Sequence, residues 1–121
     1  GVNYGWPVIS YGINYDGTVL TNLTGKEGME QPVFYWTPSI GPCGMTFVTG
    51  DRYPDWKNNI LLGSLPLKHL ERVVMKDNAV IHREQLLTGI GRVRNVVMGH
   101  DGYIYLAIET PGKILRLMPV K

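Results

Sequence analysis

Hydrophobic residues in this sequence gather in short runs, without the sustained spacing of three to four residues that indicates an amphipathic helix. The runs are rich in β-branched, aromatic and aliphatic side chains, and Gly, Pro, Asp or Asn bounds each of them, as is typical of β-strands. The one stretch that could be helical, residues 83–88, is too short to be stable alone. The pattern therefore predicts an antiparallel all-β protein. The expected strands are Met45–Val48, Ile60–Leu62, Leu70–Met75, Ala79–His82, Val93–Met98, Tyr103–Ile108 and Ile114–Met118.

Tight-turn sequences stand between several of these runs. Asp16-Gly17 and Asp101-Gly102 are strong hairpin dipeptides, because Asp tolerates and Gly favours the positive φ that such turns need. Asp77-Asn78 occupies the corresponding place between two further runs. These turns favour antiparallel pairing of neighbouring strands.

A weak internal repeat suggests how the strands are grouped. Residues 70–73 resemble residues 114–117 at an offset of 44, and residues 60–65 lie over residues 103–108 at an offset of 43. A repeat of about 40–50 residues with three or four short strands indicates a β-propeller blade. A propeller has at least four blades, and this chain has room for two and part of a third. The predicted fold is therefore part of a propeller with antiparallel four-stranded blades.

This repeat divides the chain into three parts. Residues 1–42 fit it poorly and are interpreted as the loop-rich end of a preceding blade, with up to two strands and a pocket-lining segment. Residues 43–88 are predicted to form one blade. Residues 89–121 are predicted to form a C-terminal, incomplete blade.

Composition narrows the functional classes. The chain has 121 residues, 44% of them hydrophobic, which excludes a disordered protein. Twelve Lys and Arg against ten Asp and Glu leave a scattered net charge of +2, which favours no nucleic-acid partner. No apolar run approaches the roughly 20 residues of a membrane span. Cys43 is the single cysteine, so an internal disulfide is excluded, and it is expected to be a small buried residue.

Several sequence motifs, in this order and at these spacings, resemble the C-terminal third of the soluble PQQ-dependent aldose sugar dehydrogenases, the glucose/sorbosone dehydrogenase family. The resemblance runs from Gly1 to Pro119, and the chain begins without Met, as an excised or processed segment would. It implies a six-bladed β-propeller. The motifs are Asn3–Pro7, Pro38–Met45, Tyr53–Trp56, Leu61–Leu65, Arg92–Val96 and His100–Tyr105.

The resemblance also implies a chemistry. Members of the family oxidise an aldose at its anomeric carbon to the lactone, with a His base, hydride transfer to PQQ and a calcium ion that polarises the quinone. It further implies a periplasmic or secreted protein with an aldose as substrate. The catalytic His and the calcium-binding loop lie upstream of the matched region in the family. The segment alone is therefore expected to be inactive, with the missing blades or other copies of the chain as its partners.

Arg92 and Arg94 match the family's paired cofactor-contacting arginines. Residues two apart on a strand share one face, so both side chains can point at one anionic ligand such as PQQ. The resemblance places Ser39 near the cofactor and Tyr35 and Trp36 on the sugar side of the pocket. A family lysine that reaches the cofactor is replaced here by Pro66.

Lys68, two residues beyond Pro66, is the candidate replacement for that lysine. For the arginine pair the alternative is a solvated strand face, or ion pairs with Glu84 or Glu109. His69 and His82 are expected on strand faces and His100 at a surface turn, because no metal-ligand spacing joins them.

Trp36 is equally compatible with sugar stacking and with packing, whereas Trp6 and Trp56 favour packing. The alternative function for the whole chain is a non-catalytic, propeller-derived binding or structural module that self-association could complete.

Overall fold

The computed structural model describes residues 1–120, which form two compact units, residues 1–39 and the rest of the chain from Ile40. The first unit contains turns and bends but no strand or helix, so the two strands allowed for there do not form. Side chains satisfy the backbone locally instead: Asn3 Oδ1 accepts from Gly5 N at 2.8 Å, and Asp16 Oδ1 accepts from Thr18 N at 2.9 Å. Such local hydrogen bonds compete with strand pairing.

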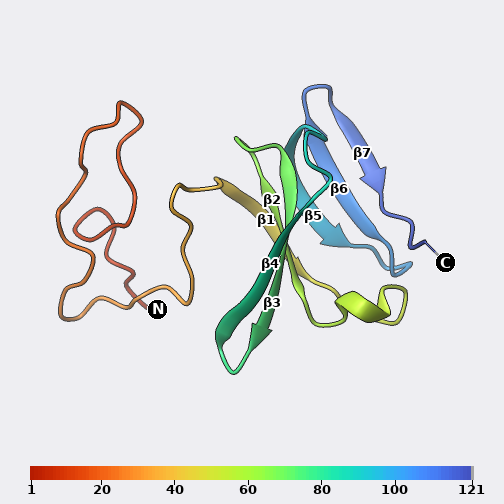
Figure 1. Cartoon of the computed structure of the whole chain (residues 1–121), viewed down its shortest axis with the longest axis horizontal. Coiled ribbons are helices and arrows are strands. Elements are labelled where there is room, and N and C mark those ends of the chain that lie inside the picture. Colours follow the sequence, from red (N-terminus) through yellow and green to blue (C-terminus); the bar gives the residue numbers. More distant parts are fainter. Residues whose placement is uncertain (121) are drawn as a thin grey trace. The chain divides into compact units, whose positions relative to one another are not determined.

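The second unit consists of two antiparallel sheets (Figure 1). The first sheet has the order β1-β2-β3-β4 and the second the order β5-β6-β7, each strand paired with its neighbour in sequence. One 3-10 turn, η1, precedes β2. The bounds are β1 Pro42–Phe47, η1 Pro54–Trp56, β2 Ile60–Ser64, β3 His69–Lys76, β4 Ala79–Leu86, β5 Arg92–Met98, β6 Ile104–Glu109 and β7 Lys113–Arg116.

The structure contains the hairpins predicted at Asp77-Asn78 and Asp101-Gly102, but it does not contain the possible helix at residues 83–88. Asp77 and Asn78 have φ of 50° and 60°, the left-handed pair that a two-residue hairpin requires between β3 and β4. Gly102, with φ of 78°, similarly lies in the turn between β5 and β6. Residues 83–86 continue β4 and are not helical, since Leu86 packs against the core and Arg83 contacts the neighbouring strand.

The core lies between the two sheets, where β1 and β2 pack against β5. The backbones approach closely at Gly63, because a Cβ there would lie 2.5 Å from the Cys43 carbonyl oxygen and 2.6 Å from that of Val93. Only a glycine in β2 permits this spacing. The fully buried side chains of the core are Val48, Leu61, Leu70, Val93, Val96, Ile104 and Leu106.

The predicted fold class is confirmed: the structure is all-β, with antiparallel sheets of four and three strands that correspond to propeller blades. The predicted division of the chain into blades after residue 42 and after residue 88 stays a prediction. None of the helical turns among residues 1–120 is long and apolar enough to cross a membrane.

Candidate functional site

Two arginines converge on one carboxylate at an end of the second sheet. Glu109, the last residue of β6, is the cross-strand partner of Arg92 in β5. Glu109 Oε2 accepts hydrogen bonds from Arg92 Nε at 3.3 Å and from the Arg94 guanidinium at 2.6 Å. The two arginines therefore share Glu109, the ion pair that the sequence gave as the alternative to a ligand contact, and their contact with an anionic cofactor stays a prediction.

A β-bulge brings Arg94 into this arrangement. The pairing of β5 with β6 shifts register between Val93 and Asn95, so Arg94 is the extra residue of the bulge. The bulged strand faces a second irregularity in β1, where the register shifts around Gly44. Gly44 has φ of 70°, and a Cβ there would lie 2.4 Å from Asn95 Oδ1, so a glycine is needed at this contact.

Cys43 links the two irregular strands. Its Sγ donates to the Arg94 carbonyl oxygen at 2.9 Å, which joins β1 to the bulge of β5. The residue is half-buried, so the expectation of a fully buried position is wrong. The physical reason is that its thiol has a backbone partner at the end of the sheet, outside the apolar core.

The cluster of Arg92, Arg94 and Glu109 is accessible and carries excess positive charge. The three side chains are 41%, 51% and 42% exposed, and two guanidinium groups face one carboxylate. The hydrogen bonds from Arg92 and then Arg94 lower the pKa of Glu109, and the hydrogen bond to Glu109 raises the pKa of Arg94. Two guanidinium groups and one carboxylate give the cluster a net charge of about +1, which is available for a further anion.

The turn between β2 and β3 holds the candidate replacement lysine. Lys68 has φ of 56°, and its carbonyl oxygen accepts from Gly89 N at 2.9 Å. Pro66 packs against Gly41, since a Cβ on Gly41 would lie 2.6 Å from the proline Cδ. The backbone of Lys68 thus has a structural role, and a cofactor contact by its ammonium group stays a prediction.

The remaining predicted residues belong to the first unit. Tyr35 stacks on Tyr11 with ring centroids 3.7 Å apart, and the Trp36 ring meets Phe34 edge-on at 4.9 Å. These contacts show that both aromatic side chains are packed within their own unit. The roles of Ser39, Tyr35 and Trp36 at a cofactor or sugar stay predictions.

A buried polar group lies on β3 and β4, where the sequence predicted only histidines on strand faces. His69 is 1% exposed, and its Nε2 lies 3.0 Å from Glu71 Oε2, two residues along the same strand. Arg83 of β4 contacts the other carboxylate oxygen at 3.4 Å. The spacing His69-x-Glu71 places both side chains on one face of the strand and is the sequence signal for this pair.

The other two histidines, His82 and His100, are exposed. No group of three or more His, Cys, Asp or Glu side chains within residues 1–120 is arranged to hold a metal ion.

The two consecutive antiparallel sheets have the form of propeller blades, and they place this chain in the class of β-propeller proteins. The chain matches the family Glucose / Sorbosone dehydrogenase over residues 1–116, and it belongs to that family. The predicted resemblance is thereby confirmed.

Individual relatives support the same assignment. The chain is 38% identical to "Aldose sugar dehydrogenase YliI" of Escherichia coli (strain K12), over 98% of this chain and 33% of that protein. It is 36% identical to "Uncharacterized protein slr1608" of Synechocystis sp., over 97% of this chain and 29% of that protein. The chain therefore spans about a third of the length of the curated relatives that it matches.

Solved structures of sugar dehydrogenases superpose well. A crystal structure of glucose dehydrogenase matches with a TM-score of 0.90 and 39% identity, over 100% of this chain and 36% of that one. The apo-form of the soluble aldose sugar dehydrogenase from Escherichia coli matches with a TM-score of 0.86 and 36% identity, over 96% of this chain and 35% of that one. The two-sheet arrangement is thus the arrangement found in these enzymes.

Proposed function

We propose that this chain is part of a PQQ-dependent sugar dehydrogenase that oxidises aldoses at C1 to lactones, and that Arg92 and Arg94 contact the cofactor. The observation that carries the proposal is the convergence of both guanidinium groups on one oxygen of Glu109. Family membership and two similar sugar dehydrogenases support the reaction class.

The arginine pair fits an anionic cofactor. PQQ bears carboxylates, and when bound it would supply the acceptor for one hydride, which carries both electrons that leave the sugar. Arginine remains charged at every physiological pH and offers parallel N–H donors that match a carboxylate. Glu109 holds the two guanidinium groups at one point, and their exposure of 41% and 51% leaves them within reach of a ligand.

The other contacts are proposed from the family resemblance. Lys68 would supply a third cation and Ser39 a hydroxyl group, while Tyr35 and Trp36 would offer aromatic faces to a sugar ring. Calcium and a catalytic base would come from parts of the enzyme outside this segment. The proposal therefore assigns this chain binding and orientation of the cofactor, and not proton abstraction.

A binding measurement on the natural protein tests the arginine pair. We expect Arg92→Ala with Arg94→Ala to weaken PQQ affinity by at least about 100-fold, since two charge-assisted contacts are lost. The control is Arg116→Ala, which removes one positive charge at the other end of the sheet, where Arg116 lies over the Tyr103 ring. Unchanged PQQ affinity in the double variant would mean that the pair is only a solvated strand face.

Activity distinguishes the proposal from the alternative of a non-catalytic module. With PQQ and calcium added, the natural protein should reduce a redox dye when glucose or another aldose is present. No PQQ binding and no dye reduction with any aldose would favour the binding or structural module.

A further inference from the structure

Arg94 lies outside the regular ladder between β5 and β6. The register of this pair steps from Val93 to Asn95, so Arg94 has no cross-strand partner in β6. The regular pairing that orients a strand side chain is therefore missing at this residue. The direction of its guanidinium group then depends on what else holds its backbone.

Cys43 of β1 holds that backbone. Its Sγ donates to the Arg94 carbonyl oxygen at 2.9 Å, and this bond joins the first sheet to the second. The hydrogen bond to Glu109 and, to a smaller extent, contact with the Cys43 sulfur raise the pKa of Arg94. The same thiol therefore contacts Arg94 at its backbone and at its guanidinium group.

The strand that carries Cys43 is itself fixed in place. Cys43 pairs with Gly63 of β2, and a Cβ on Gly63 would lie 2.6 Å from the Val93 carbonyl oxygen. The next residue, Gly44, has φ of 70°, and a Cβ there would lie 2.7 Å from Asn95 Cα. The strands thus contact β5 on both sides of the bulge, and they hold the thiol opposite it.

A positioning role explains this thiol better than a chemical one. Its hydrogen is directed to a backbone oxygen, and no metal-ligating group within residues 1–120 includes it. A thiol is a weak donor, and a serine hydroxyl group is a stronger donor of similar size. If the hydrogen bond is what matters, serine can replace this cysteine and alanine cannot.

We propose that Cys43 is a positioning residue of the cofactor site, because its thiol holds the bulge of β5 so that Arg94 meets Glu109 and faces the anionic cofactor. This inference rests on the proposed function, in which Arg94 contacts PQQ. Cys43 itself does not take part in the oxidation of the sugar.

Equilibrium PQQ binding to the protein expressed from its natural gene tests this role. We expect Cys43→Ala to weaken PQQ affinity about fivefold to tenfold, as the loss of one hydrogen bond does, and Cys43→Ser to remain within about twofold of the wild type. Wild-type affinity in Cys43→Ala would overturn the proposal, and so would equal losses in the two variants.

A double-mutant cycle shows whether Cys43 acts through Arg94. In Arg94→Ala the carbonyl oxygen remains but the guanidinium group is gone, so adding Cys43→Ala should cause no further loss of PQQ affinity. The same loss with and without Arg94 would show that Cys43 acts independently, and would overturn the proposal. Unchanged affinity in Arg94→Ala alone would instead contradict the proposed function on which the inference rests.

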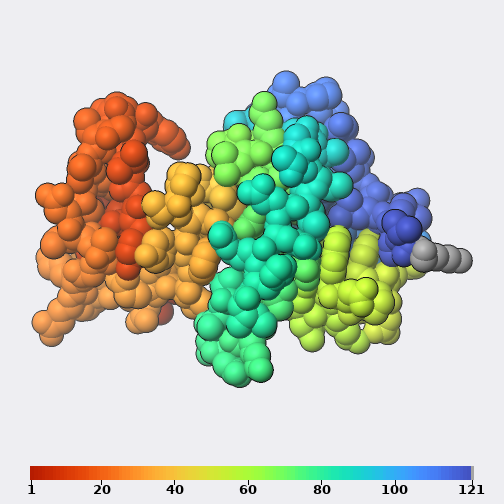
Figure 2. Space-filling view, in the orientation of Figure 1, coloured from red at the N-terminus to blue at the C-terminus, as the bar shows by residue number. Residues whose placement is uncertain are grey.

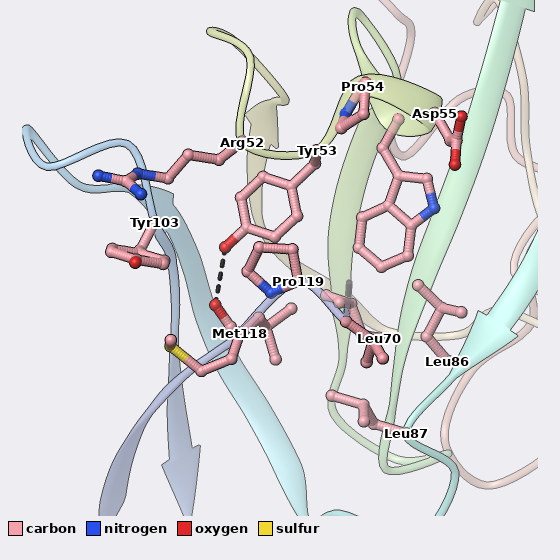
Figure 3. A pocket seen from close by; sticks show the side chains of 13 residues that line it. Arg52, Tyr53, Pro54, Asp55, Leu70, Leu86, Leu87, Tyr103, Met118 and Pro119 are labelled. Carbon is pink, nitrogen blue, oxygen red and sulfur yellow. Dashed lines mark hydrogen bonds between the residues drawn. The ribbon is translucent and has the colours of Figure 1, made fainter.

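Tyr53→Phe is the matched control for a hydrogen bond that has no positioning role. Tyr53 lines the apolar pocket of Figure 3 and donates from its hydroxyl group to Leu117 O at 2.8 Å. In Figure 2 the segment that follows β7 lies next to the loop that carries Tyr53.

This contact lies at the opposite end of β6 from the arginines. Tyr53 also accepts from Ile104 N at 3.0 Å, whereas Glu109 is the last residue of β6. Tyr53→Phe should therefore lower the melting temperature and leave PQQ affinity unchanged. A loss of affinity as large as that of Cys43→Ala would mean that any weakening of the sheets has this effect, and would contradict the proposal.

Discussion

At the scale of single residues, the cluster of Arg92, Arg94 and Glu109 forms the candidate binding site. Glycines permit the close approach of the strands that position it. Glu109 restrains two arginines that would otherwise repel each other, and it leaves one positive charge in excess. The sequence identified the arginines through the family resemblance and named Glu84 and Glu109 as possible partners. It did not reveal the bulge that turns Arg94 toward Glu109, because a bulge depends on the register with β6.

The pH dependence of stability tests the role of Glu109. Its pKa lies below the ordinary 4.5 because Arg92 and Arg94 donate to it, so its contribution is present above pH 4.5 and is lost as pH falls through the lower folded pKa. The wild type should therefore melt at a higher temperature than Glu109→Gln at pH 7, and the two should converge at acid pH, once the pH has fallen below the lowered pKa of Glu109. A melting-temperature difference that is the same at both pH values would show that Glu109 acts without its charge.

Gly63 provides a test of close packing between the sheets. Gly63→Ala would place a Cβ 2.5 Å from one carbonyl oxygen and 2.6 Å from another, so the backbones of β1 and β5 must move. We expect a loss of about 2 kcal/mol or more in the free energy of unfolding, measured with urea. Gly112→Ala is the control, because nothing lies within 4 Å of its Cβ position, and it should change stability little.

At the scale of elements, local patterning was most informative where the turn chemistry was strong. The runs around Asp77-Asn78 and Asp101-Gly102 form the hairpins that the sequence predicts. The prediction was weaker for residues 83–88, because this short segment shows neither the hydrophobic spacing of a helix nor that of a strand. Pairing with β3 makes residues 83–86 part of a strand. Pairing likewise buries His69 and Glu71, since β3 lies between two other strands.

The stability of the β3–β4 hairpin should depend on which residue occupies position 78 of its turn. Asn78 has φ of 60°, which glycine adopts without cost and a β-branched residue strongly resists. Asn78→Val should therefore lower the free energy of unfolding by about 1–2 kcal/mol, whereas Asn78→Gly should leave it within about 0.5 kcal/mol. Urea unfolding of the two variants checks this. Equal effects would mean that the turn contributes nothing specific to stability.

At the scale of the whole molecule, the chain spans about a third of its relatives, and the proposed enzyme needs more than this segment. Each unit has its own internal packing. In the second sheet β7 is an edge strand, whereas β3, its counterpart in the repeat, lies between β2 and β4. The activity of the enzyme, its calcium and its base are properties proposed for the longer protein. The arginine pair is the part of the site that this segment contributes by proposal.

A comparison of the segment with the natural protein tests this division. The 121 residues alone should give no aldose-dependent dye reduction with PQQ and calcium, because the proposed base and calcium ligands lie outside them. The natural protein should be active under the same conditions and inactive without PQQ. Turnover by the isolated segment, measured by dye bleaching, would contradict the assignment of the base to another part of the protein.

By itself the sequence determined the all-β class, the hairpin turns, the repeat of 43 to 44 residues and the family. These features depend on local periodicity, turn chemistry and the order of short motifs, all of which are readable along one chain. Three features became visible only in the tertiary structure. Arg92 and Arg94 share Glu109, His69 is buried against Glu71, and β7 is an edge strand. Each of these depends on register and on which strands become neighbours, and those are set by packing between distant residues.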